Sequence, residues 1–523
     1  MLSWALAGLC VWLGFAAVGL VLAIFGVLLV RLLKLHHRAT ALFAPLAQAR
    51  QALDAGDTAR CEALLGQLAA ARPPPEFHLW LGILRSHVAF NRGTPEAAAT
   101  ALSEAIHGPG RTLCTVSTLG AIVLALRALA YALLGRAEQA RADLTAHDAH
   151  PARTADTIAP ARLAEAWLLG QAGDGRAQAE LVSRDATALL NRMGPAQRPL
   201  VRALAISANR RDYAYRTSAR PDPVSPRANR AAPRTRIALR INPSWRQGSR
   251  ARGVVIVAGV MALIVGAFWL PKVLAWQGLG VALLAVVAFV VYGMVFRRRR
   301  SREARQLNAA RVDLIWGDQR RGHRQLVALA GGRDDEVAVD ACVHLTIDAE
   351  ERGDLDAALD ACDAGLARIE SGRAQLPTQS WTAPKLTELQ AYLRAASGEL
   401  ARSQRELDTL RATFPDYAFL VAGVHRVRLM QAARARDWHE MARLEAHRAP
   451  AMTISARDEL LGRVGGMLAS GATREDLAEI RAELDAFPSY ERWLDVVVPG
   501  ALDELKLRAT PIEPQPTTRT NPE

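Results

Sequence analysis

Histidines are the first residues in this 523-residue chain whose spacing could support chemistry. His147 and His150 are spaced to share one face of a helix, where two imidazoles can bind one transition metal. No third ligand is near them in the sequence, and Pro151 places the pair at a helix end. His36 and His37 follow a long apolar run and fit interfacial side chains better than ligands. The histidines therefore predict no metal site.

Cysteines and aspartates lead to the same expectation. Cys342 and Cys362 fall on facing helices of one predicted hairpin, where a redox pair and small core residues are the two interpretations. The aspartates from Asp354 to Asp363 lack the glycine and glutamate of a calcium loop and fit a solvated helix face. The sequence has no phosphate-binding glycine loop, no His-Glu-x-x-His and no Gly-x-Ser-x-Gly. We therefore expect no catalytic, cofactor-binding or metal-binding residues, no cofactor and no enzymatic activity.

Long apolar runs are the first of the elements that organise these residues. The run from Trp4 to Val30 has no charge, exceeds a secretory signal in length and is followed by its first basic residue, so it predicts a retained membrane anchor. A second run, residues 253–296, has Lys272 as its only charge. Its length suits two bilayer crossings with Trp269 and Trp276 at one interface. The alternative is a buried helical hairpin in a globular core.

Basic clusters predict the topology of these spans. They follow the first run and flank the hairpin on both sides, and basic residues favour the cytoplasmic side of a membrane. We expect a multi-pass protein of a bacterial inner membrane, with both large soluble parts cytoplasmic and with the N-terminus and residues 271–277 external. The arginines beside the hairpin are also candidate contacts to anionic lipid headgroups, namely Arg246, Arg250, Arg252, Arg297, Arg298, Arg299 and Arg300.

Charge and composition divide the rest of the chain. The net charge is +13, but residues 216–252 carry ten arginines against one aspartate, while residues 301–523 carry a net charge of −7. Positive charge gathered near the predicted spans favours lipid headgroups as partners over nucleic acid. We predict an anchor (1–33), a helical domain (34–215), a basic disordered linker (216–252), a transmembrane hairpin with an Arg-rich stop (253–300), a second helical domain (301–509) and a disordered tail (510–523).

Both soluble parts repeat one pattern of two apolar-periodic helices split by a glycine. Gly56 is followed by Asp57, small Cys61, Leu65 and Pro73, and Gly398 and Gly471 begin similar series. Gly135 and Gly353 share most of the pattern, and Gly93, Gly173 and Arg436-Asp437 are weaker copies. This pattern resembles the tetratricopeptide repeat family of helix-turn-helix units. The glycine would adopt a left-handed conformation, Asp57 and Asp354 would cap second helices, and small Ala140 and Ala358 would allow close packing.

The resemblance implies an all-α, membrane-anchored α-solenoid in which the first helix of each pair lines a groove. It implies a scaffold or adaptor that gathers cytoplasmic proteins, with unidentified proteins or peptides as partners. The alternative is a subunit of an envelope enzyme, transport or sensing complex whose chemistry lies in a partner. Mapping from the turns gives the candidate groove residues Lys385, Glu388, Tyr392, Arg426 and Met430 in the second domain, and Ile83, His87 and Phe90 in the first.

Overall fold

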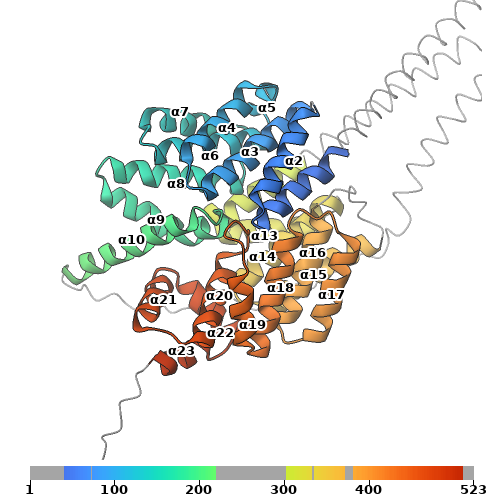
Figure 1. The fold of residues 1–523 in the computed structure, drawn as a ribbon, viewed down its shortest axis with the longest axis vertical. Helices are drawn as coiled ribbons and strands as arrows, with labels where there is room; N and C mark the ends of the chain where they lie inside the picture. Colours follow the sequence, from blue (N-terminus) through green and yellow to red (C-terminus); the bar gives the residue numbers. More distant parts are fainter. Residues whose placement is uncertain (1–40, 72, 219–301, 333–334, 372–380, 510–523) are drawn as a thin grey trace, which may run out of the picture.

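Helices are the only regular elements in the part of the chain that the computed structural model describes, residues 41–71, 73–218, 302–332, 335–371 and 381–509 (Figure 1). The predicted all-α class is confirmed for these residues. None of the helices in these ranges is long and apolar enough to cross a membrane. The predicted spans, the arginines beside the hairpin and the tail from residue 510 lie outside the described residues.

Residues 41–218 form the N-terminal helical half, a series of antiparallel helix pairs. A helix over residues 41–54 pairs with α2 (Thr58–Ala70), and α10 (Arg198–Ser218) ends the series, so the first residues of the predicted 216–252 linker are helical. The elements between them are α3 (Pro75–Asn91), α4 (Pro95–His107), the short α5 (Arg111–Cys114), α6 (Thr118–Leu133), α7 (Ala137–Asp148), α8 (Ala155–Gln171) and α9 (Gly175–Arg192).

Residues 302–509 form the C-terminal helical half with the same alternation. A helix over residues 302–316 precedes α13 (Gln319–Ala330). The pairs that follow are α14 (Asp335–Glu351) with α15 (Leu355–Glu370), α16 (Thr382–Ala396) with α17 (Leu400–Thr413), α18 (Leu420–Ala435) with α19 (Trp438–Ala446), α20 (Ala456–Ser470) with α21 (Arg474–Ala486), and α22 (Pro488–Val497) with α23 (Ala501–Ala509).

A left-handed residue closes the turn between the two helices of most pairs. This conformation costs an L-residue free energy but is open to glycine, so a helix can end and the chain can reverse at once. Asp57 and Asp354 then accept hydrogen bonds from backbone N–H groups in the first turns of α2 and α15, as the sequence predicts. Every predicted turn position has this conformation: Gly56, Gly93, Gly135, Gly173, Gly353, Gly398, Gly471 and, without glycine, Arg436.

Small side chains let the helices of each pair and of neighbouring pairs pack closely. Ala140, Ala358, Cys61 and Ser403, all near the start of second helices, are fully buried. First helices also pack on one another, as α6 does on α8 and α16 on α18. One apolar core runs without interruption from Ala128 to Leu505. The described helices therefore stack into an α-solenoid, in which each pair is stabilised by its neighbours (Figure 1).

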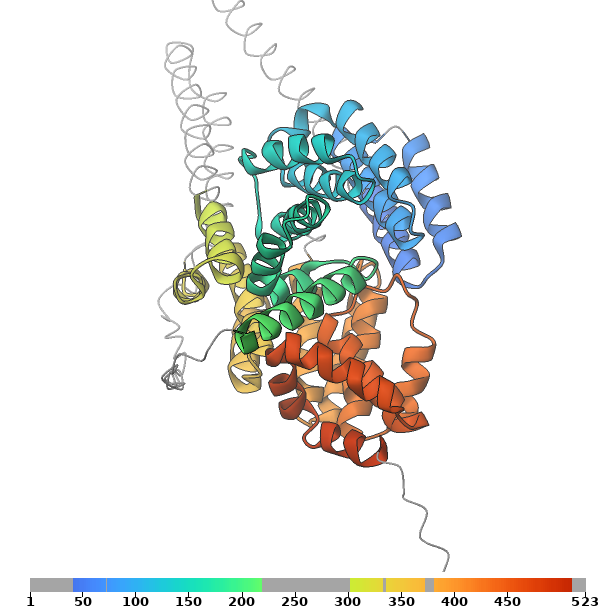
Figure 2. The same cartoon turned by 90° about the vertical axis from the view of Figure 1, so that its left-hand side faces the viewer.

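The two halves are joined through α10, which packs against α21 (Figure 2). Arg198 is only 2% exposed, and its guanidinium donates to Glu459 at 2.5 Å and to the carbonyl oxygen of Ile454 at 2.6 Å. Arg202 contacts Glu459 at 2.6 Å and Glu483 at 3.0 Å. Buried arginines with two or more acceptors fix geometry in a way that exposed ion pairs do not. This contact sets the position of α10 on the C-terminal half.

Further contacts connect the halves at two other places. Near the start of the N-terminal half, Gln51 donates to the carbonyl oxygen of Tyr417 at 2.7 Å. Gly56 lies so close to Ala449 that a Cβ on the glycine would stand 2.8 Å from the Cβ of Ala449. Near α8, the indole N–H of Trp316 donates to the carbonyl oxygen of Ala155 at 2.8 Å. The halves therefore form one packed unit, although 83 residues outside the described ranges separate them in sequence (219–301).

Alanine substitutions at three glycines should separate the cost of the left-handed turn from the cost of crowding. Gly135→Ala should lower the free energy of unfolding by about 1 kcal/mol, because the left-handed backbone is unfavourable for a residue with a Cβ. The added Cβ meets no neighbouring atom there, so crowding adds nothing to this cost. Gly56→Ala should cost more, since its Cβ also meets Ala449. Gly66→Ala, in an exposed and ordinary position of α2, should stabilise by up to about 1 kcal/mol. Thermal unfolding followed by circular dichroism tests this order, and equal losses at Gly135 and Gly56 would contradict it.

Cutting the chain between the halves should not separate them. With a protease site inserted at residue 230 of the detergent-solubilised chain, we expect both fragments to co-elute after cleavage, because Arg198 and Arg202 hold α10 to α20 and α21. The double substitution Arg198→Ala, Arg202→Ala should weaken their association, so that a larger fraction separates on dilution, while the contacts of Gln51 and Trp316 remain. Arg162→Ala, which removes an ion pair to Glu165 within α8, is the control and should leave co-elution unchanged. Separation of the unsubstituted fragments would show that the contact is too weak to join the halves.

Candidate functional site

The candidate groove residues of the C-terminal half lie together, but inside the molecule. Lys385, Glu388 and Tyr392 come from α16, and Arg426 and Met430 come from α18, so all five are on first helices of neighbouring pairs as expected. All except Lys385, which is half-buried, are buried. The face that they share is covered by the rest of the solenoid and does not form an open groove at these positions.

Arg426 is the centre of a buried charged cluster on this face. Its guanidinium donates to Oδ2 of Asp458 at 2.5 Å and lies 3.4 Å from carboxylate oxygens of Glu350 and Glu388. It also stacks over the ring of Tyr392, 3.9 Å from the ring centroid, where a cation is attracted to the π-electrons. Tyr392 in turn donates its hydroxyl hydrogen to Oδ1 of Asp458 at 2.9 Å. One guanidinium therefore links α14, α16, α18 and α20.

The remaining acceptors of this cluster are largely occupied by neighbours. Glu388 accepts from the hydroxyl of Tyr417 at 3.0 Å and from the ammonium of Lys385 at 2.7 Å. Ser455 caps α20 and donates to Oδ2 of Asp458 at 2.6 Å. Gly423 leaves the space that Glu388 needs, because a Cβ there would stand 3.0 Å from the Glu388 carboxyl carbon. Such a closed network holds helices in register and offers no surface to a ligand.

The carboxyl groups of the cluster are shifted in opposite directions. Burial acts to raise the pKa of Asp458, but the charge of Arg426 and three hydrogen bonds outweigh it, so the pKa lies below the usual 3.8. Burial dominates at Glu350, where the pKa lies above its usual 4.5 despite Arg457 and Arg426. Burial also raises the pKa of the Tyr392 phenol well above 10.0. The ion pair between Arg426 and Asp458 is therefore the fixed centre of the network.

The candidate groove residues of the N-terminal half, all on α3, are also turned inward. Ile83 and Phe90 belong to an apolar core cluster with residues of α4 and α6. Burial, with a smaller contribution from Arg50, lowers the pKa of His87 to about 3, so its ring is neutral at physiological pH. Ile83 and Phe90 are buried and His87 is half-buried, and all three stabilise the stacking of the first pairs.

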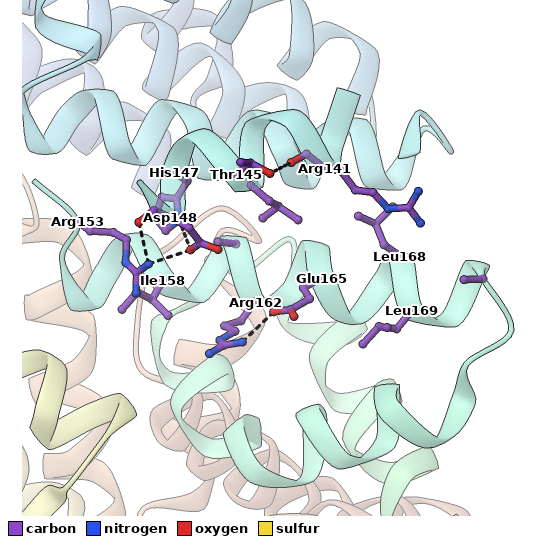
Figure 3. A pocket seen from close by; sticks show the side chains of 13 residues that line it. Arg141, Thr145, His147, Asp148, Arg153, Ile158, Arg162, Glu165, Leu168 and Leu169 are labelled. Carbon is purple, nitrogen blue, oxygen red and sulfur yellow. Dashed lines mark hydrogen bonds and ion pairs between the residues drawn. The ribbon is translucent and has the colours of Figure 1, made fainter. Parts of the chain in front are cut away.

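An open cavity of about 630 Å³ lies elsewhere, between α7 and α8 (Figure 3). Aliphatic side chains and polar or charged side chains of both helices line it together. Its position follows from the turn at residues 149–154, after which α8 packs mainly on α6 and α9 and less on α7. The lining residues are Arg141, Leu144, Thr145, His147, Asp148, Arg153, Ile158, Ala161, Arg162, Glu165, Leu168, Leu169 and Ala172.

The residues with possible chemistry are used in packing. His147 hydrogen-bonds to Thr157 at 3.0 Å, and His150 to the carbonyl oxygen of Cys114 at 2.8 Å, so the two rings do not converge on one point. Cys342 and Cys362 are buried free thiols, and burial raises both pKa values. Within the described ranges, no three histidine, cysteine, aspartate or glutamate side chains lie close enough together to hold a metal ion.

The sequence did not indicate the cavity or the role of Asp458. Arg457, Asp458 and Glu459 look like the solvated first turn of α20, yet all three are buried because α20 packs on α19, α18 and α23. The only indication in the sequence is that three consecutive charged residues leave the first turn of α20 without an apolar face. The cavity depends on the angle between α7 and α8, which no residue pattern encodes.

Comparison with known protein families, with curated proteins and with solved structures found no match for this chain.

Replacing the two carboxyl groups of the cluster should have unequal effects. Asp458→Asn should lower the free energy of unfolding by roughly 3 kcal/mol at pH 7, because Arg426 loses its closest charge in a buried site. Glu350→Gln should cost less, since burial already favours the neutral form of that group. The folded pKa of Asp458 is lowered, so its stabilising contribution is present above 3.8 and is lost as pH falls through the folded value.

Urea unfolding at several pH values measures both effects. The difference between the unsubstituted chain and Asp458→Asn should shrink as pH falls below 3.8. Arg443→Ala, which removes an exposed pair with Glu440, is the control and should cause little change at any pH. A larger loss for Glu350→Gln than for Asp458→Asn at pH 7 would contradict this account.

Proposed function

We propose that this chain is a membrane-anchored scaffold that gathers cytoplasmic proteins at a bacterial inner membrane through its tetratricopeptide-like helix pairs. The observation that carries the proposal is the series of stacked pairs with left-handed turns. A stack of this kind exposes a long surface made of many helices, which suits the binding of extended partners. The long apolar runs of the sequence would hold this surface at the membrane.

The predicted groove residues of the C-terminal half are occupied by one another, so partners would be bound on other faces. Two features of the described helices support a binding role. The cavity between α7 and α8 is open and combines aliphatic and charged side chains. The contacts of Arg198 and Arg202 join both halves into one body. A rigid surface binds with less loss of conformational entropy than a flexible one.

The second candidate is a subunit of an envelope enzyme, transport or sensing complex whose chemistry lies in a partner. In that case the two halves would serve as an assembly platform for one fixed complex. The two candidates differ in the number of partners. A scaffold binds several proteins that exchange with one another, whereas a subunit of a complex copurifies with one set of proteins in constant proportion.

Labelling of single cysteines tests the membrane placement on which the proposal depends. In intact spheroplasts, a membrane-impermeant thiol reagent should label Pro271→Cys and should not label Ser225→Cys. Cys10 is first replaced by Ser, and background from the other native thiols, Cys61, Cys114, Cys342 and Cys362, should be low, because all four are buried. The reverse pattern would place the helical halves outside the cytoplasm. If neither site is labelled and the protein is found in the soluble fraction of the cells, the proposed membrane anchor is wrong.

A further inference from the structure

The cavity between α7 and α8 has the dimensions of a trough. Its lining on α8 runs from Ile158 to Ala172, which is about 21 Å along a helix axis at 1.5 Å per residue. A volume of about 630 Å³ spread over that length leaves room for a narrow, elongated occupant. An extended peptide advances about 3.4 Å per residue, so roughly six residues would fill the trough. A compact ligand would leave much of its length empty.

His147 closes one end of this trough. Its Nε2 atom lies 3.0 Å from the hydroxyl of Thr157, which also lies 3.0 Å from the carbonyl oxygen of Thr154. Burial first, and then the charge of Arg153, lower the pKa of His147 to about 4, so the ring stays neutral at physiological pH.

The Nδ1 atom of His147 lies 3.5 Å from Oδ1 of Asp148, which also lines the cavity. The His147 side chain is only 1% exposed, so its ring nitrogens contact the protein and do not face an occupant. An occupant would therefore be recognised by the aliphatic lining and by the charges at the other end.

The opposite end of the trough carries one exposed cation, Arg141. The other two lining arginines, Arg153 and Arg162, are paired with the lining carboxylates Asp148 and Glu165, at 2.9 Å and 2.8 Å. Arg141 has no ion pair among the described residues. Figure 3 shows His147, Asp148 and Arg153 together at one end and Arg141 toward Leu168 at the other. An acidic group of an occupant would therefore lie at the Arg141 end.

We propose that the trough between α7 and α8 binds an extended segment of a partner protein, about six residues long, that carries aliphatic side chains and one carboxylate. The aliphatic side chains pack on Leu144, Ile158 and Leu168. The carboxylate pairs with Arg141. This site deepens the scaffold function proposed above and rests on it, since it names the kind of segment that the scaffold would hold.

Selection from a display library of random hexapeptides tests the proposal on the full-length chain in detergent. Peptides enriched on this chain should be rich in aliphatic residues and carry Asp or Glu, and their affinity is then measured by fluorescence anisotropy. Thr145→Trp should weaken binding at least tenfold, because Thr145 is an exposed lining residue and an indole there fills the trough. Ala146→Trp is the matched control, since Ala146 is exposed on the same helix but does not line the cavity, and it should bind as the unsubstituted chain does.

A charge exchange tests the position of the carboxylate. Arg141→Glu should weaken the selected acidic peptides at least tenfold, and replacing their Asp or Glu by Lys should restore binding to that variant. Equal binding to the unsubstituted chain and to Thr145→Trp would overturn the trough as the site and leave the scaffold function standing. A failure to enrich any peptide, or enrichment without preference for Asp or Glu, would overturn the proposal as well. The membrane placement is tested separately by cysteine labelling, so the two failures are distinguishable.

Discussion

Reversal of the chain within two or three residues is the constraint on which this structure depends. Two helices can pack closely along their length only if the connection between them is short, and a short connection requires a left-handed residue at the end of the first helix. Glycine meets that requirement at Gly56, Gly135 and Gly353, among others, and the capping aspartates start the next helix at once. Everything later in the fold follows from pairs made in this way, because each pair buries its apolar face only against the next.

Stacking of the pairs brings their first helices together, and charge is what fixes them there. The Arg426 guanidinium touches α14, α16 and α20 from its place on α18, so one side chain sets the register of four helices. A buried ion pair adds little net stability compared with an apolar core, but it is strongly directional. Since Arg457, Arg198 and Arg202 use acceptors in the same way, the inner face of the solenoid is specified by geometry and leaves the outer surfaces and the α7–α8 trough for partners.

The local parts of this fold could be predicted from the sequence, and the long-range parts could not. Turn glycines, capping aspartates and small residues such as Ala140 act within a few residues of themselves, so their pattern is legible in one dimension. The candidate groove residues of the C-terminal half lie on first helices as expected, but their burial was not foreseen, because it depends on how α14, α20 and Tyr417 pack over them. The buried position of His147 depends on a hydrogen bond to Thr157, ten residues away, and on the direction of α8.

The contact between α10 and the C-terminal half has a consequence for synthesis of the chain. Arg202 is made 257 residues before its partner Glu459, and at about 5–20 residues per second a ribosome needs on the order of 13–50 s to cover that distance. During this interval α10 has its arginines without carboxylates, and Val201 and Ala205 lack part of the core that later buries them. The N-terminal half therefore leaves the ribosome with an unfinished edge, and its last helix becomes native only when the end of the same chain arrives.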